Sequence, residues 1–504
     1  MPFSASIIRD MYVRAGVLSL SLLILSRVMG LLRESAQAAA FGSSGLGDAV
    51  IVMFTLPDWL VSMLFGGALS YVLLPLWAQQ SPAEQQDTQQ KVGRVLLITS
   101  LLMGVAIWLF RDLVSRALAP GLKGEMQALA AASFVWSAAV LPFAVLATLW
   151  ATRLQHERDF VGMYAGSLVV NALLVLALFV TAKIGAGPDS MLILGTFLAM
   201  AMLARLVWLY WRLPKASTVT PSPAPLPKAG IWLWAGLSSG LLLLLPLIAR
   251  SLASQSGEGA LASFNYAWKL IELPLVLAIQ LVASLAFPAI TQAEAGSAAR
   301  HTALHTAFLL AWALACAAVA VVATFSLPIA GLLFGWGRMA PEHLVVIADW
   351  SAVGVWSLLP QALIAVVLTL MAASHQMHVA AWAYVAGVLA LAGAGWTGLS
   401  GGEAVMWTLN AVLSGVALAL LANQRRQLSG VLAWPAMLTP LVVCLALVSC
   451  RPWFAGLGLV WSLLLALLWA ILVCGSAVSA SPLLRSWVRG IRPGTGQGPA
   501  HIAP

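Results

Sequence analysis

Long apolar runs, separated by polar or proline- and glycine-rich breaks, fill most of the chain. A membrane-spanning helix needs about 20 predominantly apolar residues, and about fourteen runs reach that length. Their approximate bounds are 15–40, 50–78, 92–110, 128–152, 161–182, 190–211, 231–253, 261–290, 303–325, 343–370, 376–397, 404–422, 432–450 and 455–475. Almost no period-two alternation occurs inside them, which favours helices over barrel strands. The pattern predicts an all-α, polytopic membrane protein.

The composition of the chain supports the same class. Of 504 residues, 61% are hydrophobic and 9% are charged, whereas soluble proteins have roughly 45–50% and about 25%. So few charged groups cannot cover the surface of a soluble globule of this length. The net charge of +9 comes from basic residues spread thinly over the connections. That distribution fits membrane topology and a lipid bilayer as partner better than nucleic acid.

Lysine and arginine are distributed unevenly between alternate connections of the predicted spans. With the N-terminus inside, about fifteen fall on the cytoplasmic side and about six on the other side. This imbalance predicts that both termini are cytoplasmic. Further basic residues lie inside the predicted spans, namely Arg27, Arg33, Arg205, Arg250 and Lys269.

A proline-rich polar linker, 212–230, divides the chain. We expect an N-terminal six-helix lobe over 1–211 and a C-terminal six-helix lobe over 231–424. Two additional helices follow over 425–480, and a disordered cytoplasmic tail over 481–504. The second and eighth predicted spans occupy matching places in the two lobes, and prolines interrupt both.

Each interrupted span leads into a glutamine- and alanine-rich polar loop, 79–90 in one lobe and 292–299 in the other. Paired interrupted helices point to a transporter site between two repeats, although prolines are also common in membrane helices. The candidate hinge residues are Gly30, Pro57, Pro75, Pro274 and Pro288.

Arg27 lies close to the middle of the first predicted span, where an arginine costs ~2.5–3.5 kcal/mol. Such a residue needs a charged partner or a wet cavity. Glu34, seven residues on, lies on the same helical stripe, and Arg33 points to another side. Two interpretations stay open: a structural pair between Arg27 and Glu34, or an anion site in which guanidinium groups bind phosphate oxygens.

Lys269 lies in the eighth predicted span, three residues before Glu272, so the two can form a local salt bridge. Pro274 disrupts the helix immediately afterwards, which is typical of a segment that lines a cavity. Asp48, near the start of the second span, can bind a cation, orient an arginine or cap a helix. We therefore take Lys269, Glu272 and Asp48 as further candidate substrate-binding residues.

The sequence contains no nucleotide-binding loop, serine nucleophile elbow, HExxH zinc motif or aspartate-rich diphosphate motif. The histidines lack the carboxylate or cysteine partners that a metal site needs. We expect a protein that is not an enzyme and that uses no cofactor, metal site or nucleic acid.

Two segments carry a family resemblance. The first is SRVMGLLRE, from Ser26 to Glu34, which continues through FG, DA, LPD, GALS and a proline at 41–42, 48–49, 56–58, 67–70 and 75. The second is YAWKLIELP, from Tyr266 to Pro274. In order and spacing they resemble the MurJ (MviN) family of lipid II flippases, within the multidrug/oligosaccharidyl-lipid/polysaccharide exporter superfamily.

The resemblance implies a monomeric, multi-pass protein of the bacterial inner membrane. It would move an undecaprenyl-pyrophosphate-linked saccharide, lipid II first of all, from the cytoplasmic to the periplasmic leaflet by alternating access. Arg27, Arg33, Asp48 and Lys269 hold the family's substrate-site positions, and the last two helices would form a groove for the lipid tail. A monovalent cation is a further candidate ligand.

The chain departs from the family pattern at several positions. Val61 and Ser62 stand where the family commonly has an arginine pair, and Lys269 stands where it has arginine. A flippase for another lipid-linked exopolysaccharide or O-antigen repeat unit therefore stays open as an alternative. A small-molecule antiporter of the same superfamily and a membrane enzyme acting on prenyl-linked sugars are competing classes. The sequence is compatible with transport driven by an ion gradient, by the membrane potential or by consumption of the product.

Overall fold

The computed structural model describes residues 3–64, 68–185, 187–214, 223–294, 296–374, 376–399, 401–454 and 456–491; for 3–20, 288, 291–292 and 487–491 it describes the backbone. Helices make up nearly all of these residues, and no strand occurs among them. Within the described ranges, 12 helices are long and apolar enough to cross a membrane. The predicted all-α, polytopic class is confirmed.

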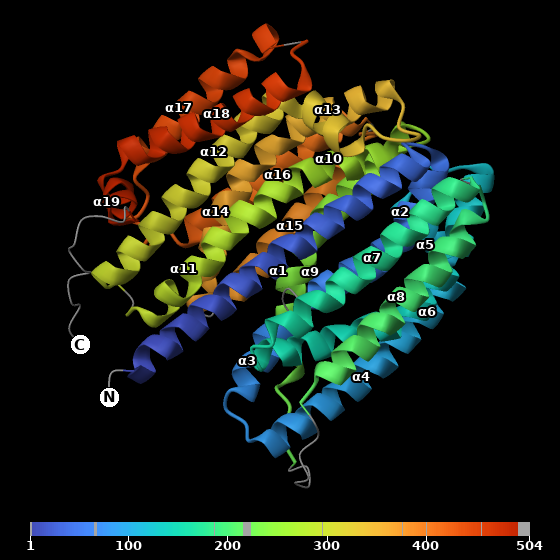
Figure 1. The fold of residues 1–504 in the computed structure, drawn as a ribbon, viewed down its shortest axis with the longest axis horizontal. Helices are drawn as coiled ribbons and strands as arrows, with labels where there is room; N and C mark the ends of the chain where they lie inside the picture. The colour runs from blue at the N-terminus through green and yellow to red at the C-terminus, as the bar shows by residue number, and fades with distance from the viewer. Residues whose placement is uncertain are drawn as a thin grey trace. The chain divides into compact units, whose positions relative to one another are not determined.

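The helices follow the predicted spans closely (Figure 1). They are α1 (Phe3–Phe41), α2 (Gly45–Met63), α3 (Leu69–Trp77), α4 (Pro82–Leu109), α5 (Arg111–Leu118), α6 (Gly124–His156), α7 (Phe160–Ile184), α8 (Ser190–Arg212), α9 (Ala229–Ala253), α10 (Ala260–Pro274), α11 (Gln280–Gln292), α12 (Ala298–Phe334), α13 (Pro341–Gly354), α14 (Leu358–Ala373), α15 (Met377–Trp396), α16 (Gly402–Asn423), α17 (Trp434–Ser449), α18 (Leu459–Ala480) and α19 (Pro482–Ile491). Together with α1 and the shorter α17, the 12 long apolar helices overlap the predicted spans, and the second predicted span, 50–78, also covers α3.

Packing divides the chain into two compact units. The first unit comprises Met1–Leu270, Ile329–Gly354 and Gln376–Val416, and the second comprises Ile271–Pro328, Val355–His375 and Ala417–Pro504. The six-helix lobes over 1–211 and 231–424 stay a prediction.

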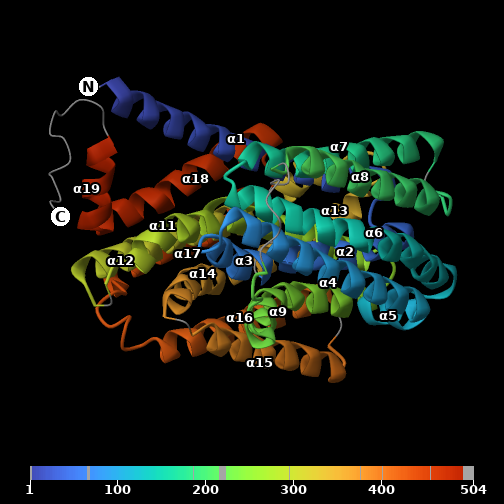
Figure 2. The ribbon, with the colours of Figure 1, turned by 90° about the horizontal axis from the view of Figure 1, so that it is seen from below.

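In the first unit, α7 and α8 run side by side (Figure 1, Figure 2). Helix α1 packs along α7, and α6 packs against α2, α4 and α8. The proline-rich linker is held to α4 at Ala224, whose N–H donates to Asp87 (2.9 Å) and whose carbonyl accepts from Lys91 (3.0 Å). Helices α1, α2 and α9, together with α10 as far as Leu270, all belong to this unit.

Pro57 lies inside α2 and has no N–H, so the carbonyl of Met53 loses its helical donor. The hydroxyl of Ser137, on α6, donates to that carbonyl at 2.6 Å and is itself fully buried. A side chain from the neighbouring helix thus supplies the hydrogen bond that the Met53 carbonyl loses to the proline. Such bonds allow a proline within a membrane helix.

In the second unit, α17 and α18 pack along each other. Buried side chains join them to α12 and α19, namely Leu309, Ala313, Ala436, Met437, Ala477 and Leu484. The indole of Trp312 donates to the Met437 carbonyl at 2.9 Å. A π-helical turn, Leu275–Ile279, separates α10 from α11.

The prediction of a polar loop over 79–90 is wrong for most of that segment, because α4 begins at Pro82. Ser81 and Glu84 form a reciprocal capping box, and proline occupies the first helical turn. These are strong helix-start signals, and the glutamines that follow are good helix formers.

Helix α19 occupies Pro482–Ile491, inside the segment expected to be disordered. The Ser481 hydroxyl accepts from the Leu484 N–H at the helix start (3.4 Å), and Leu484 is buried. The capping bond and the burial of Leu484 stabilise this helix. Residues 492–504 of the expected tail lie outside the described residues.

Candidate functional site

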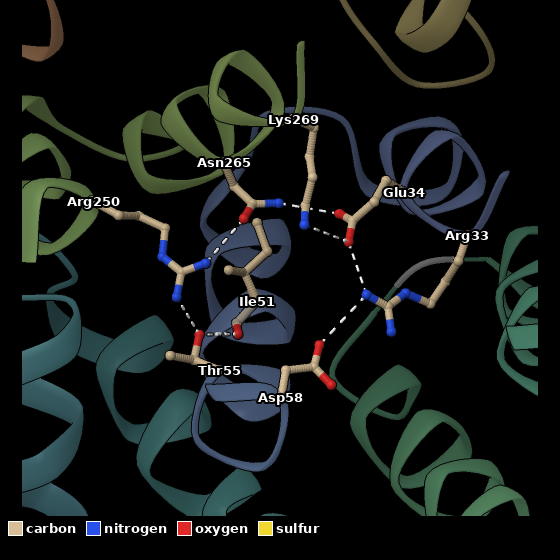
Figure 3. Close-up of polar contacts among 8 residues, drawn as sticks. All are labelled: Arg33, Glu34, Ile51, Thr55, Asp58, Arg250, Asn265 and Lys269. Atoms are coloured by element: carbon tan, nitrogen blue, oxygen red, sulfur yellow. Dashed lines mark hydrogen bonds and ion pairs between the residues drawn. The ribbon is translucent and has the colours of Figure 1, made fainter. Parts of the chain in front are cut away.

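Helix α1 contributes two adjacent charged side chains to a polar cluster (Figure 3). The guanidinium of Arg33 donates to Glu34 Oε1 at 2.9 Å and to Asp58 Oδ2, on α2, at 3.4 Å. Arg33 also lies over the ring of Phe54, 6.0 Å from its centroid. The side chain of Glu34 is 7% exposed, so its charge is largely removed from solvent and depends on these partners.

Helix α10 contributes Asn265 and Lys269, which share a helical face because they are four residues apart. The Asn265 amide donates to Glu34 Oε2 at 3.1 Å, and Lys269 Nζ lies 3.9 Å from Glu34 Oε1. Both carboxylate oxygens of Glu34 thus face donors from α10, and α1 and α10 are tied together at this point.

Arg250, on α9, completes the cluster. It donates to Asn265 Oδ1 at 2.9 Å and to the Thr55 hydroxyl at 2.7 Å. Because a guanidinium only donates and a carboxylate only accepts, the orientation of the Asn265 amide between Arg250 and Glu34 is fixed. Thr55 in turn donates to the Ile51 carbonyl at 2.6 Å.

We call this set the Glu34 cluster; its members are Arg33, Glu34, Thr55, Asp58, Arg250, Asn265 and Lys269. Its cations outnumber its carboxylates, so it carries a net positive charge. All members belong to the first unit and come from α1, α2, α9 and α10. Chemically, such a cluster is suited to binding an anion through guanidinium and ammonium groups.

Arg27 is exposed and lies outside the Glu34 cluster. Arg27 and Glu34 lie on the same helical face, but they do not form the ion pair that this spacing allows. Glu34 instead bonds to its sequence neighbour Arg33 and to Asn265 on α10. Glu272 belongs to the second unit. Of the residues expected to bind substrate, the described structure thus brings together Arg33, Glu34 and Lys269.

Asp48 caps a helix. It is 1% exposed, and its two oxygens accept from the backbone N–H groups of Gly259 (2.8 Å) and Ala262 (2.7 Å) at the start of α10. Reciprocally, Glu258 Oε1 accepts from the Gly45 N–H at the start of α2 (3.1 Å). These three bonds satisfy orphan donors at both helix starts and join α2 to α10.

We expect Asp48→Asn to lower the free energy of unfolding by about 2–4 kcal/mol, because an amide can replace one charged acceptor at most. Thermal unfolding of the purified protein measures this. Asp189→Asn, at an exposed carboxylate before α8, is the matched control and should change stability by less than about 0.5 kcal/mol. An Asp48→Asn protein of normal stability that loses substrate binding would contradict the capping role.

The expected hinge residues lie in or at the ends of helices. Helix α1 passes through Gly30 without a break, and α10 ends at Pro274, where the π-helical turn follows. The remaining candidates are Pro57 in α2, Pro75 in α3 and Pro288 in α11. A hinge role for them stays a prediction.

Sequence reasoning did not assign Arg250, Asn265 and Thr55 to the site. Arg250 could have been assigned from the sequence, since it is one of the basic residues inside a predicted span. Asn265 lies one helical turn before Lys269, and this spacing places both residues on the same face. Thr55 has no such signal, because a threonine in a membrane helix normally bonds to its own backbone. A many-helix membrane fold that gathers charged residues in its interior is typical of a secondary transporter.

The family model of the lipid II flippase MurJ matches residues 37–470, so the chain belongs to that family. A probable lipid II flippase MurJ of Rhizobium meliloti (strain 1021) is 26% identical over 353 residues, which are 65% of this chain and 64% of the relative. The chain therefore spans somewhat less than two thirds of that curated relative.

Two solved structures share the fold. A lipid II flippase MurJ in an inward closed conformation aligns over 94% of this chain and 100% of that chain, with a TM-score of 0.76 and 16% identity. An inward-facing multidrug resistance MATE family transporter of the MOP superfamily aligns over 81% and 95%, with a TM-score of 0.63 and 17% identity. At these identities the likeness shows the fold, and the family model distinguishes between the two kinds of transporter.

Proposed function

We propose that the protein is a flippase that moves an undecaprenyl-diphosphate-linked saccharide, with lipid II as the first candidate, from the cytoplasmic to the periplasmic leaflet. The family match over residues 37–470 supports this activity. The Glu34 cluster supports the assignment of the diphosphate as the group that the protein recognises. The site of action would be the inner membrane of a bacterium.

The observation that carries the proposal is the convergence of Arg33 and Lys269, from separate helices, on one carboxylate. Carboxylate and phosphate oxygens accept the same charge-assisted hydrogen bonds from these cations. Glu34 therefore occupies an anion position. A diphosphate arriving there would replace the carboxylate as the acceptor, with its own oxygens between Arg33 and Lys269.

The energetic need for such a site is large. An isolated ion in a hydrocarbon medium costs tens of kcal/mol by Born arithmetic, so a diphosphate headgroup cannot cross unaided. Cations within the helices would replace the lost hydration. The Nε of Arg33 is buried and makes no hydrogen bond within the described residues, so one donor is in reserve for a substrate oxygen.

The prenyl chain needs an apolar surface while its headgroup is inside the protein. Val442 on α17 and Leu467 and Ile471 on α18 are large exposed hydrophobic side chains that suit this role. Alternating access would follow from rocking of the two six-helix lobes around the fixed anion site, in a monomer with both termini cytoplasmic. A monovalent cation as coupling ion is part of the same proposal.

A second candidate is a flippase for another lipid-linked saccharide. The observation that favours it is Lys269 itself, because an ammonium keeps the charge of an arginine but loses the bidentate fork. An antiporter for cationic drugs fits less well, since the Glu34 cluster carries more cations than carboxylates.

Complementation tests the proposal. We expect the wild-type gene to restore growth to bacteria depleted of their own lipid II flippase, and the Lys269→Ala variant to fail at equal membrane abundance. Failure of the wild-type protein, despite correct insertion, would contradict lipid II as substrate and favour the polysaccharide candidate.

A further inference from the structure

Asp58, on α2, is the less firmly held of the two carboxylates in the Glu34 cluster. Its side chain is 49% exposed, against 7% for Glu34. Its contact with Arg33 is 3.4 Å long, which is beyond the usual hydrogen-bond range of up to about 3.2 Å. Oδ2 makes this contact, and the other oxygen accepts no hydrogen bond from the residues that the structure describes (Figure 3). Asp58 therefore has an unbonded oxygen on a half-exposed side chain.

The two carboxylates share one nitrogen of Arg33, because Nη2 donates to both. Glu34 Oε1 and Asp58 Oδ2 are therefore no further apart than these two bonds laid end to end. A phosphate oxygen that replaces Glu34 on this nitrogen would lie equally close to Asp58. Two anions at such a separation repel each other strongly in a poorly hydrated interior. A bound phosphate therefore needs a positive charge between itself and Asp58.

The charge of the Glu34 cluster is too small to neutralise a diphosphate. The cluster holds three cations, Arg33, Arg250 and Lys269, and two carboxylates, so a single positive charge is in excess. The diphosphate of a lipid-linked saccharide adds about two negative charges, one on each phosphate group. The occupied site would be negative overall, and an uncompensated charge away from water is costly. A divalent cation would make the site positive again.

Mg²⁺ has ligand preferences that this arrangement meets. It is usually held by one or two carboxylates together with the phosphates of a substrate, and it keeps several water ligands. Asp58 supplies a carboxylate, and its half-exposed position leaves room for water. Among the described residues, no group of three or more histidine, cysteine or carboxylate side chains could hold a metal by itself. The ion would therefore arrive on the diphosphate.

We propose that Asp58 binds a Mg²⁺ ion carried on the diphosphate, so that the protein recognises the magnesium complex of its lipid-linked substrate. Arg33 and Lys269 bind phosphate oxygens, and Asp58 binds the metal on the same group. Asp58 thus changes from a partner of Arg33 to a ligand of Mg²⁺ when the substrate enters. This inference rests on the proposed function, since the substrate supplies the diphosphate.

The test is the affinity for undecaprenyl diphosphate with and without Mg²⁺, measured with the full-length protein in lipid nanodiscs. Mg²⁺ should strengthen binding to the wild type about tenfold, and EDTA should reverse the gain. Without Mg²⁺, Asp58→Asn should bind at least as well as the wild type, because a competing carboxylate is removed. Adding Mg²⁺ should then improve binding to this variant by less than about twofold.

A matched variant and a second metal serve as controls. Asp159→Asn removes a carboxylate that pairs with Arg212 (2.9 and 2.8 Å), outside the Glu34 cluster. This variant should gain from Mg²⁺ as the wild type does. Mn²⁺ also prefers oxygen ligands, and its electron paramagnetic resonance spectrum reports binding directly. With undecaprenyl diphosphate present, the wild type should bind more Mn²⁺ than Asp58→Asn, whose signal should match that of nanodiscs without protein.

An equal gain from Mg²⁺ in the wild type and in Asp58→Asn would overturn the inference, because the ion would then act on the diphosphate alone. Unchanged binding to the wild type on addition of Mg²⁺ would overturn it as well. A wild-type protein that does not bind undecaprenyl diphosphate, with or without Mg²⁺, would instead refute the proposed function, and the inference with it.

Discussion

Arg33→Gln is expected to lower the rate of lipid translocation in reconstituted vesicles by at least about 100-fold. Each charge-assisted hydrogen bond contributes about 1.5–3 kcal/mol, and a guanidinium fork forms two of them to a phosphate group. Their loss raises the barrier by more than about 2.7 kcal/mol, which corresponds to that change in rate. The measurement is the transfer of a fluorescent lipid-linked substrate between leaflets.

Matched variants separate charge from geometry in this experiment. Arg33→Lys should retain part of the activity, because the charge stays while the fork is lost. Lys269→Gln should lower the translocation rate as Arg33→Gln does, and Arg212→Gln should leave it at the wild-type value. Full activity of Arg33→Gln in correctly inserted protein would reduce its contacts to Glu34 and Asp58 to a structural ion pair.

The second large effect is expected on stability, from Glu34→Gln. Removing this carboxylate leaves Arg33 and Lys269 without the counter-charge they share. Breaking one side of a buried pair typically costs about 3–5 kcal/mol. We therefore expect a marked drop in the thermal unfolding midpoint of the protein in detergent, while the helix content at low temperature stays unchanged.

Added undecaprenyl diphosphate should then raise the midpoint of Glu34→Gln more than that of the wild type, because the ligand supplies the missing negative charge and binds without competition. Glu84→Gln is the matched control, since Glu84 is a partly exposed carboxylate in the capping box of α4. If Glu34→Gln is as stable as Glu84→Gln and gains nothing from the ligand, Glu34 does not stand in for the substrate.

The hydropathy pattern predicts the helices well because each membrane span must satisfy its backbone polar groups internally, so its length is set by the bilayer. The same pattern does not locate the ends of helices that lie in polar segments. The start of α4 depends on the local exchange of hydrogen bonds between Ser81 and Glu84. Helix α19 depends on the contact of Leu484 with other helices, which the sequence alone does not show.

Charged residues in apolar runs made Arg33, Glu34 and Lys269 recognisable before the structure, because their cost implies partners. Which partners they take depends on the packing of α1 against other helices. Arg27 and Glu34 share a stripe, yet the long side chain of Arg33 reaches back to its neighbour and pairs with Glu34 instead. Uncharged Asn265 gave a weaker signal, because its role as a bridge requires Arg250 from another helix.

Arg33 and Lys269 are proposed to hold a diphosphate during its passage. An experimental structure of the protein with bound undecaprenyl diphosphate tests this role. We predict phosphate oxygens within hydrogen-bond distance of both cations, with Glu34 withdrawn from Arg33. A headgroup bound elsewhere, with the bond between Arg33 and Glu34 intact, would refute this role of the two cations.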